Sequence, residues 1–217
     1  MYNNQVLTVN GFDMFEVVSA MQKSIRRCKE DDALYWGVEM FESGFVSYAW
    51  KRLIIIAMED VGMADPNAIV QIKTLKDVYD SMTKDDKKGQ FRLPFVQAIL
   101  YLVHAPKSRI VDWAQGFWFD NNVCQEIRKE IPDYALDTHT RRGKKMGKGI
   151  NEFFSEGSIL ENHKVMPNED FYREKCKERW TSKEWCAKQT ALSEQRKEAK
   201  ESKPKPTESS DLQGSLF

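Results

Sequence analysis

Two apolar segments occupy residues 33–66 and meet at a short break, Ser43-Gly44. In the first, apolar residues recur three and four positions apart, which is the spacing of one helical face: Leu34, Val38 and Phe41. The second covers residues 46–61 and is apolar on nearly every side. Its Ile54-Ile55-Ile56 run would suit a buried strand, but the length of the segment and its internal charges favour a buried helix. The pattern predicts an antiparallel helical hairpin.

Helix-ending and helix-starting residues follow this hairpin. Gly62 suits the position just past a helix, because glycine readily adopts the left-handed conformation found there. Asp65-Pro66 suits an N-cap followed by a proline at the first helical position. We therefore expect a new helix to open at Asp65-Pro66.

Apolar residues also recur at helical spacing in the sequence before and after the hairpin. Asp13 suits the N-cap of a helix that ends near Cys28 and whose stripe is Phe15, Val18, Met21, Gln22 and Ile25. Further helices are predicted over residues 66–82, 91–104, 108–121, 123–130, 168–179 and 182–200. The inward residues expected in the first of these are Ile69, Ile72, Leu75, Val78 and Tyr79. Since no strong strand alternation occurs, the fold class is all-α, with at least six helices.

The expected core lies in and around the hairpin, and its buried residues include Leu34, Leu53, Ile55, Ile56, Ile72, Ile99 and Leu102. After Pro132 the sequence pattern changes to short segments, with four glycines between residues 133 and 160. The sequence thus predicts three regions: a helical domain over residues 12–131, a basic and glycine-containing segment with a helical extension over residues 132–200, and a linker with a terminal motif over residues 201–217.

Composition narrows the function classes. The chain has 217 residues, with 33 Lys plus Arg and 33 Asp plus Glu, so any attraction to nucleic acid must come from a local patch. The four cysteines are widely spaced and form no CxxC pair, which favours reduced thiols over a zinc site or a disulfide framework. No signal core and no membrane-spanning segment are present, so we expect a cytoplasmic protein.

Several motifs occur in the order and rough spacing of a known family: Ser19-Ala20, Lys23-Ser24-Ile25-Arg26, Asp32-Ala33-Leu34-Tyr35-Trp36, the run from Arg52 to Pro66, Gln97-Ala98-Ile99-Leu100-Tyr101-Leu102 and Ala105-Pro106-Lys107-Ser108. Together they resemble the C-terminal domain of the MgsA/RarA-type AAA+ ATPases, replication-associated recombination proteins that are relatives of clamp loaders. The resemblance covers residues 12–121. It implies a helical domain that assembles into a homotetramer, with the ATPase part N-terminal to it.

The ATPase motif of that family does not occur in this sequence. No run satisfies GxxxxGK[ST], and the nearest, from Gly143 through Gly147-Lys148-Gly149, has the wrong glycine spacing and a glycine in place of the magnesium-binding hydroxyl. ATP hydrolysis therefore does not carry over, and we expect no enzyme activity and no cofactor. The segment after Pro132 also departs from the family, although Met146-Gly147-Lys148-Gly149 is similar to a glycine-basic stretch at its C-terminus.

The candidate catalytic groups have simpler interpretations. Glu59, Asp60 and Asp65 could form a carboxylate pair for acid–base or metal chemistry, but no histidine or nucleophile shares their motif. We expect Glu59 or Asp60 to pair with a nearby cation and Asp65 to cap a helix. The histidines have no metal-ligand spacing: His104, His139 and His163. No catalytic residue and no metal ligand is assigned.

The basic run over residues 141–148 has two interpretations. Its cations are Arg141, Arg142, Lys144, Lys145 and Lys148. Interleaved glycines could let backbone N–H groups and charges converge on phosphate, or the run could be a solvated face. Lys107-Ser108 could likewise bind an anion at a helix N-terminus, although Ser108 as a simple N-cap is favoured. The tryptophan pairs are expected to pack rather than stack on bases: Trp113 with Trp118, and Trp180 with Trp185.

The last five residues, Gln213-Gly214-Ser215-Leu216-Phe217, resemble the bacterial sliding-clamp-binding motif. The matching residues are Gln213, Ser215, Leu216 and Phe217, whereas Gly214 stands where leucine is usual. The alternative is a chance apolar end on a polar linker, ESKPKPTESS over residues 201–210.

Three hypotheses follow. The first is a non-catalytic replication or recombination accessory protein that self-associates and tethers to a sliding clamp. The second is a sequence-independent DNA-binding protein that acts through residues 141–148, or an accessory subunit of a separate AAA+ ATPase. The third is an enzyme of unknown type, which would need a convergent polar pocket.

Overall fold

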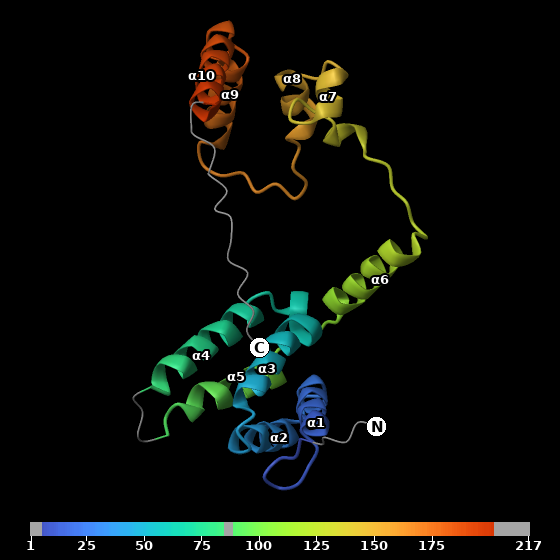
Figure 1. The fold of residues 1–217 in the computed structure, drawn as a ribbon, viewed down its shortest axis with the longest axis vertical. Helices are drawn as coiled ribbons and strands as arrows, with labels where there is room; N and C mark the ends of the chain where they lie inside the picture. Colours follow the sequence, from blue (N-terminus) through green and yellow to red (C-terminus); the bar gives the residue numbers. More distant parts are fainter. Residues whose placement is uncertain (1–5, 85–88, 202–217) are drawn as a thin grey trace, which may run out of the picture. The chain divides into compact units, whose positions relative to one another are not determined.

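The structure, a computed structural model, describes residues 6–84 and 89–201, and its chain divides into two units at Arg128/Lys129 (Figure 1). Unit 1 contains α1 (Met14–Arg26), α2 (Glu30–Glu42), α3 (Val46–Ile56), the π-helical turn η1 (Ala57–Val61), the 3-10 turn η2 (Gly62–Ala64), α4 (Ala68–Met82), α5 (Arg92–His104) and α6 (Ile110–Cys124). Unit 2 contains η3 (Asp133–Ala135), α7 (Arg141–Lys145), α8 (Ile150–Glu152), η4 (Phe153–Gly157), α9 (Glu169–Trp180) and α10 (Lys183–Glu201). Across the described residues, extended pairing is limited to one isolated bridge between Leu7 and Asp13. The all-α prediction is confirmed.

The hairpin of α2 and α3 has the predicted break. The N–H of Gly44 donates to Phe41 O at 3.1 Å and that of Phe45 donates to Met40 O at 2.9 Å. This is the Schellman pattern, and it requires the left-handed φ of 80° that Gly44 adopts. The Ile54-Ile55-Ile56 run is helical, so the helix interpretation is confirmed and the strand alternative is wrong.

The core of unit 1 lies around α3, which packs on α1, α2, α4 and α5. Trp50 is fully buried, and its ring lies 5.5 Å from that of Tyr79 on α4 and 5.4 Å from that of Phe95 on α5. Helices α2 and α5 approach closely at Gly37, where an added Cβ would lie 2.3 Å from Ile99 Cδ1. Large side chains and one essential glycine therefore fix the packing of four helices.

Most predicted core residues are buried: Leu53, Ile56, Ile72, Ile99 and Leu102. Leu34 is partly buried against the core. The prediction that Ile55 is buried is wrong, because Ile55 is 38% exposed. One residue turns a helix by about 100°, so Ile55 leaves the face that Leu53 and Ile56 share three positions apart. Among the predicted stripes, Phe15 and Val78 are also exposed.

Two predicted helix boundaries are wrong. Helix α4 begins at Ala68, and its N-cap is Asn67 rather than Asp65. Asp65 instead accepts from the backbone N–H of Asn67 at 3.1 Å and so caps the turn before the helix. The helix predicted over residues 123–130 is absent, since α6 ends at Cys124 and Gln125 adopts a left-handed φ of 55°.

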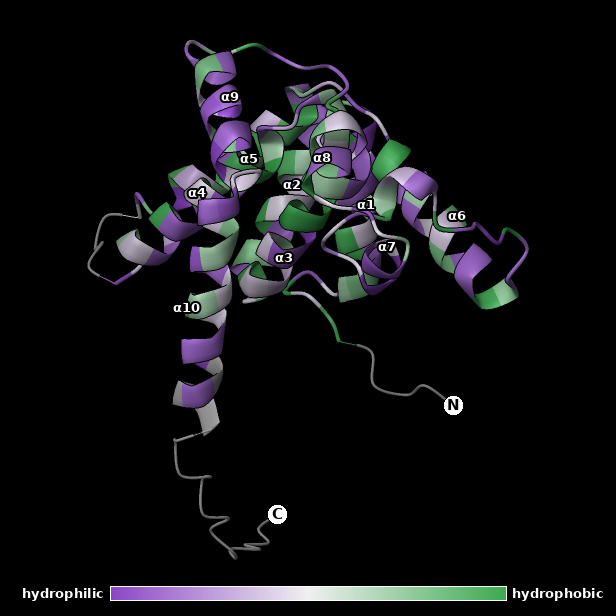
Figure 2. Cartoon of the chain, turned by 90° about the horizontal axis from the view of Figure 1, so that it is seen from above, coloured by the Kyte–Doolittle hydropathy of each residue, from purple (hydrophilic) through white to green (hydrophobic). Residues whose placement is uncertain are grey.

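Unit 2, described by itself, is built from short helices and polar contacts. The predicted helices over residues 168–179 and 182–200 are confirmed as α9 and α10. Figure 2 shows hydrophilic segments along much of both helices, and no residue of α9 is buried. In the described part of unit 2 the buried apolar side chains are Leu136 and Phe154.

Candidate functional site

A group of charged side chains joins three parts of unit 1 that are distant in sequence. We call it the polar joint, and its members are Gln22, Arg26, Arg52, Glu59, Asp60 and Arg109. They come from α1, α3, η1 and the residue before α6. The joint therefore connects the start of α6 to the core helices.

Asp60 is the centre of the joint, because its side chain is fully buried. Arg26 Nε lies 2.7 Å from Asp60 Oδ1, and Arg26 also reaches Glu59 Oε1 at 3.2 Å. Arg109 reaches the same Glu59 oxygen at 2.9 Å, and Gln22 Nε2 donates to Asp60 Oδ2 at 3.1 Å. Two carboxylates are thus shared between two guanidinium groups, each with 29% of its side chain exposed.

The backbone around the joint fixes how α6 begins. The N–H of Ser108 donates to Asp60 O at 2.9 Å. At Gly62, with a φ of 49°, an added Cβ would lie 3.1 Å from Val111 Cγ2 and 3.4 Å from Ser108 O. The π-helical turn η1 and the glycine after it therefore leave room for the first turn of α6.

Residues from three of the family-like motifs meet at the joint. Arg26, Glu59-Asp60, Gly62 and Ser108 come from three separate motifs and meet at this one place. The predicted pairing of Glu59 and Asp60 with cations is confirmed. The partners, Arg26 and Arg109, were not identified from the sequence, since nothing local to Glu59 points to residues 33 and 50 positions away.

The neighbouring candidates also have structural partners. Asp65 accepts from the hydroxyl of Tyr101, and this hydrogen bond raises the pKa of Tyr101. Lys107 Nζ donates to Val103 O at 3.0 Å and to Ala105 O, at the end of α5. Lys107 therefore satisfies helix carbonyls rather than an anion. The Ser108 hydroxyl accepts from Ile110 N at 3.3 Å, although the N-cap of α6 is Arg109.

Helix α6 extends from the joint with its side chains exposed. None of its fifteen residues, all within the described part, is buried, and exposed fractions reach 63% at Trp113, 53% at Phe117 and 71% at Phe119. Arg109 lies over the Trp113 ring at 4.6 Å. The Trp118 ring lies 5.2 Å from that of Phe117, while Trp113 and Trp118 remain 63% and 45% exposed. Trp180 does pack, at 5.7 Å from the Phe154 ring.

The basic run predicted to bind phosphate forms helix α7. Thr140 caps the helix by accepting from Gly143 N at 3.0 Å, and it donates to Asp137 O at 3.1 Å. Gly143 is buried against the same segment, where an added Cβ would lie 2.0 Å from Asp137 O. His139 donates to the Asp137 carboxylate and lowers the pKa of Asp137. Asp137 is thus committed to holding this turn.

Four cations of the run are exposed on α7: Arg141, Arg142, Lys144 and Lys145. Within residues 6–84 and 89–201 none of the four forms an ion pair. Lys148 differs, because its ammonium donates to Asp133 Oδ2 at 2.6 Å and to Asp133 O at 3.0 Å, and 15% of its side chain is exposed. Lys148 therefore holds the loop, while the other four cations face solvent.

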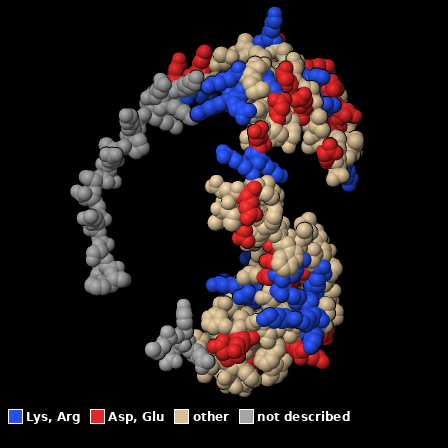
Figure 3. All heavy atoms as spheres, turned by 90° about the vertical axis from the view of Figure 1, so that its right-hand side faces the viewer, with Lys and Arg blue, Asp and Glu red and all other residues tan. Residues whose placement is uncertain are grey.

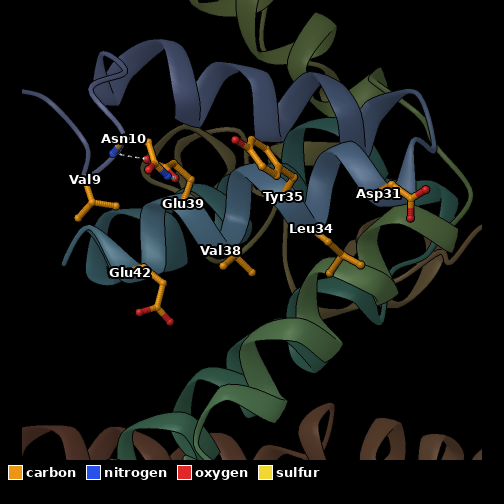
Figure 4. Close-up of a pocket in the computed structure, with 8 residues that line it drawn as sticks. All are labelled: Val9, Asn10, Asp31, Leu34, Tyr35, Val38, Glu39 and Glu42. Carbon is orange, nitrogen blue, oxygen red and sulfur yellow. Dashed lines mark hydrogen bonds between the residues drawn. The ribbon is translucent and has the colours of Figure 1, made fainter.

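A shallow pocket of about 480 Å³ lies between the N-terminal segment and α2 (Figure 4). Its apolar lining is Val9, Leu34, Tyr35 and Val38, and its polar lining is Asn10, Asp31, Glu39 and Glu42. Hydrogen bonds from Thr8 and Asn10 lower the pKa of Glu39, which accepts from Asn10 Nδ2 at 2.6 Å. Glu39 is thus a structural carboxylate that fastens the N-terminal segment to α2.

The histidines pair with carboxylates: His139 with Asp137 and His163 with Glu169 nearby in sequence, and His104 of α5 with Glu30 of α2. The four cysteines are free. Over the described residues there is no group of three or more His, Cys, Asp or Glu able to hold a metal, and no helix is long and apolar enough to cross a membrane. The proposed clamp motif, Gln213 to Phe217, lies outside the described residues.

Comparison with known proteins agrees with the resemblance seen in the motifs. The family model described as "MgsA AAA+ ATPase C terminal" matches residues 28–200, so the expectation that the segment after Pro132 departs from the family is wrong. Replication-associated recombination protein A from Haemophilus influenzae is 33% identical over 132 residues, which covers 60% of this chain and 27% of the relative. The protein of that name from Escherichia coli K12 is 34% identical over 146 residues, which covers 64% of this chain and 30% of the relative. ATPase WRNIP1 from Dictyostelium discoideum is 30% identical over 104 residues, which covers 47% of this chain and 11% of the relative. The chain thus spans less than a third of the length of these relatives.

Proposed function

Because the chain belongs to the MgsA AAA+ ATPase C-terminal family, we propose that it is a non-catalytic accessory protein of DNA replication or recombination. Three relatives from different bacteria carry the name Replication-associated recombination protein A. The proposal has three parts: self-association through the helical domain over residues 12–131, most simply as a tetramer, DNA contact through α7, and attachment to a sliding clamp through Gln213, Ser215, Leu216 and Phe217.

The observation that carries the DNA part is the set of four exposed cations on α7. The whole chain has no net charge, and both cations and carboxylates occur on the visible faces of both units (Figure 3). A local group of cations without ion pairs can bind phosphates without first breaking a contact within the protein. Each phosphate contact releases condensed counterions, so affinity falls steeply with salt. Contacts to phosphates carry no sequence information, so we expect this binding to be sequence-independent.

The experiment is DNA binding by fluorescence anisotropy across a salt series, with single-stranded, duplex and forked DNA. Lys144→Glu combined with Lys145→Glu weakens binding and flattens the plot of log affinity against log salt by about 2, because about 0.9 counterions are released per contact. A matched control, Lys177→Glu with Lys183→Glu, makes the same change in net charge on α9 and α10 and leaves the slope near that of wild type. If wild type binds no DNA at low salt, α7 is a solvated face and this part is wrong.

The clamp part rests on the last five residues of the sequence. Leu216 and Phe217 supply two apolar anchors, and Gln213 supplies a donor and an acceptor three residues earlier. Leu216→Ala with Phe217→Ala abolishes binding to a bacterial sliding clamp in surface plasmon resonance and leaves thermal unfolding unchanged. Equal clamp affinity for wild type and a chain truncated after Ser210 would contradict this part.

The second candidate is an accessory subunit of a separate AAA+ ATPase, favoured by the family to which the chain belongs. One outcome separates it from the first candidate. If this second candidate is correct, affinity purification of the intact chain recovers an AAA+ ATPase in fixed proportion. The ATPase is still recovered when Gln213 to Phe217 are removed.

A further inference from the structure

Helix α6 is anomalous among the helices of unit 1. It is apolar over most of its surface, yet none of its residues is buried, whereas every other α-helix of unit 1 has at least three buried residues. A helix with a broad apolar side normally packs that side against other protein. The first turn of α6 is fixed by the polar joint, so the helix is held in place with its apolar side chains exposed.

One side of α6 carries no charged residue. We call it the α6 stripe, and at about 100° per residue its members are Ile110, Trp113, Ala114, Phe117, Trp118, Asn121 and Cys124. The two charged residues of the helix lie outside the stripe: Asp112 projects from the opposite side and pairs with Arg109, and Asp120 lies at the edge of the stripe.

The one amide on the stripe already has its partners. Asn121 Oδ1 accepts from Ile127 N at 2.6 Å, and Asn121 Nδ2 donates to Ile127 O at 3.1 Å. Covering the stripe would therefore leave neither end of this amide unsatisfied, and an unsatisfied buried amide is the usual cost of burying such a residue. The charge nearest the stripe is the Arg109 guanidinium over the Trp113 ring, and it already pairs with Glu59 and Asp112.

We infer that the α6 stripe is where two copies of this chain pair, antiparallel about a two-fold axis at Phe117. This inference rests on the proposed self-association and names its interface. In that arrangement Phe117 meets Phe117, Trp113 meets Asn121 and Ile110 meets Cys124, so no charge opposes a like charge. A two-fold axis is the commonest symmetry of protein pairs, and it requires a self-complementary surface of this kind.

The exposed area is sufficient for a reversible pair. Aromatic side chains bury roughly 150–250 Å² each, and Trp113, Phe117 and Trp118 are 63%, 53% and 45% exposed. With Ile110 and Ile127 added, the stripe offers on the order of 500 Å² per copy, or about 1,000 Å² in total, the lower limit for a specific interface. Pairing through α6 gives a dimer, and a tetramer then needs one further contact elsewhere.

The test compares two phenylalanines of the same helix. Phe117 lies in the stripe, whereas Phe119 points about 160° away and is 71% exposed. Sedimentation velocity over a micromolar concentration series, on the intact chain, measures the mass of wild type, Phe117→Asp and Phe119→Asp. We expect Phe117→Asp to halve the wild-type mass and Phe119→Asp to leave it unchanged. Circular dichroism checks that both variants keep the wild-type helix content, which is expected since neither side chain is buried.

A second measurement keeps the inference falsifiable if Phe117→Asp fails to fold. In a chain whose natural cysteines are replaced by alanine, Phe117→Cys forms a disulfide-linked dimer on mild oxidation, whereas Phe119→Cys does not. An oligomeric wild type whose mass is unchanged in Phe117→Asp overturns the α6 interface and leaves the proposed self-association standing. A monomeric wild type at every concentration overturns both.

Discussion

Unit 1 and unit 2 are held together in different ways. The described part of unit 1 has 21 buried apolar side chains in one continuous core, whereas that of unit 2 buries Leu136 and Phe154. Unit 2 instead relies on polar contacts, such as the Thr140 cap of α7 and the ion pair between Lys148 and Asp133. The contrast is consistent with the proposed division of labour, in which unit 1 mediates self-association and unit 2 presents cations to DNA.

The largest effect should come from the core of unit 1, where two adjacent isoleucines form a matched pair. Ile56→Ala removes a fully buried side chain and should lower the free energy of unfolding by about 2–5 kcal/mol. Ile55→Ala, at a side chain that is 38% exposed, should cost less than about 1 kcal/mol. Urea unfolding of both variants measures the difference. Similar costs at the two positions would show that α3 does not present the face described here.

The next effect concerns the polar joint. Asp60→Ala leaves Arg26 and Arg109 without their buried partner and should cost about 3 kcal/mol, near the lower end for a broken buried pair because both arginines keep some water. Asp77→Ala, which removes an exposed pair with Lys73, should cost less than about 1 kcal/mol. Urea midpoints again provide the measurement. A cost below 1 kcal/mol at Asp60 would mean that the joint does not fasten α6 to the core.

A smaller and more local effect is expected in unit 2. Gly143→Ala places a methyl group where Asp137 O lies only 2.0 Å away, so it should destabilise the α7 turn by about 1–3 kcal/mol. Gly149→Ala meets no atom closer than 3.5 Å and serves as the control. Hydrogen exchange should show faster exchange over residues 137–145 in Gly143→Ala and unchanged protection in α3. Loss of protection in both units would contradict their separate stabilities.

The two units also differed in how far their structures could be predicted. Helical spacing identified the hairpin and most of the core of unit 1, because a buried face repeats every three to four residues along the sequence. It failed at Ile55, where a continuous apolar run hides which side chains turn outward. It failed again at residues 123–130, where the left-handed Gln125 ends α6 and no glycine marks the end.

Candidate sites whose residues are close in sequence could be predicted, whereas sites built from residues distant in sequence could be predicted only in part. The cations of α7 are adjacent in sequence, so their clustering was visible, whereas the hold of Asp133 on Lys148 spans fifteen residues and was not. The polar joint contains contacts between residues up to 50 positions apart, and so its carboxylates were recognised without their arginine partners. The exposure of α6 could not be read from its composition, because an apolar helix has the same sequence pattern whether or not another element covers it.

The division of labour between the units is tested most directly by DNA affinity in a variant that alters unit 1 alone. Phe117→Asp lies far in sequence from the α7 cations, yet it should weaken binding to forked DNA, because separated copies lose the gain that comes from engaging one DNA at several points. The measurement is fluorescence anisotropy at fixed salt for Phe117→Asp against Phe119→Asp. We predict an affinity at least about tenfold lower for Phe117→Asp than for Phe119→Asp. Equal affinities would contradict the claim that unit 1 gathers the DNA-binding units.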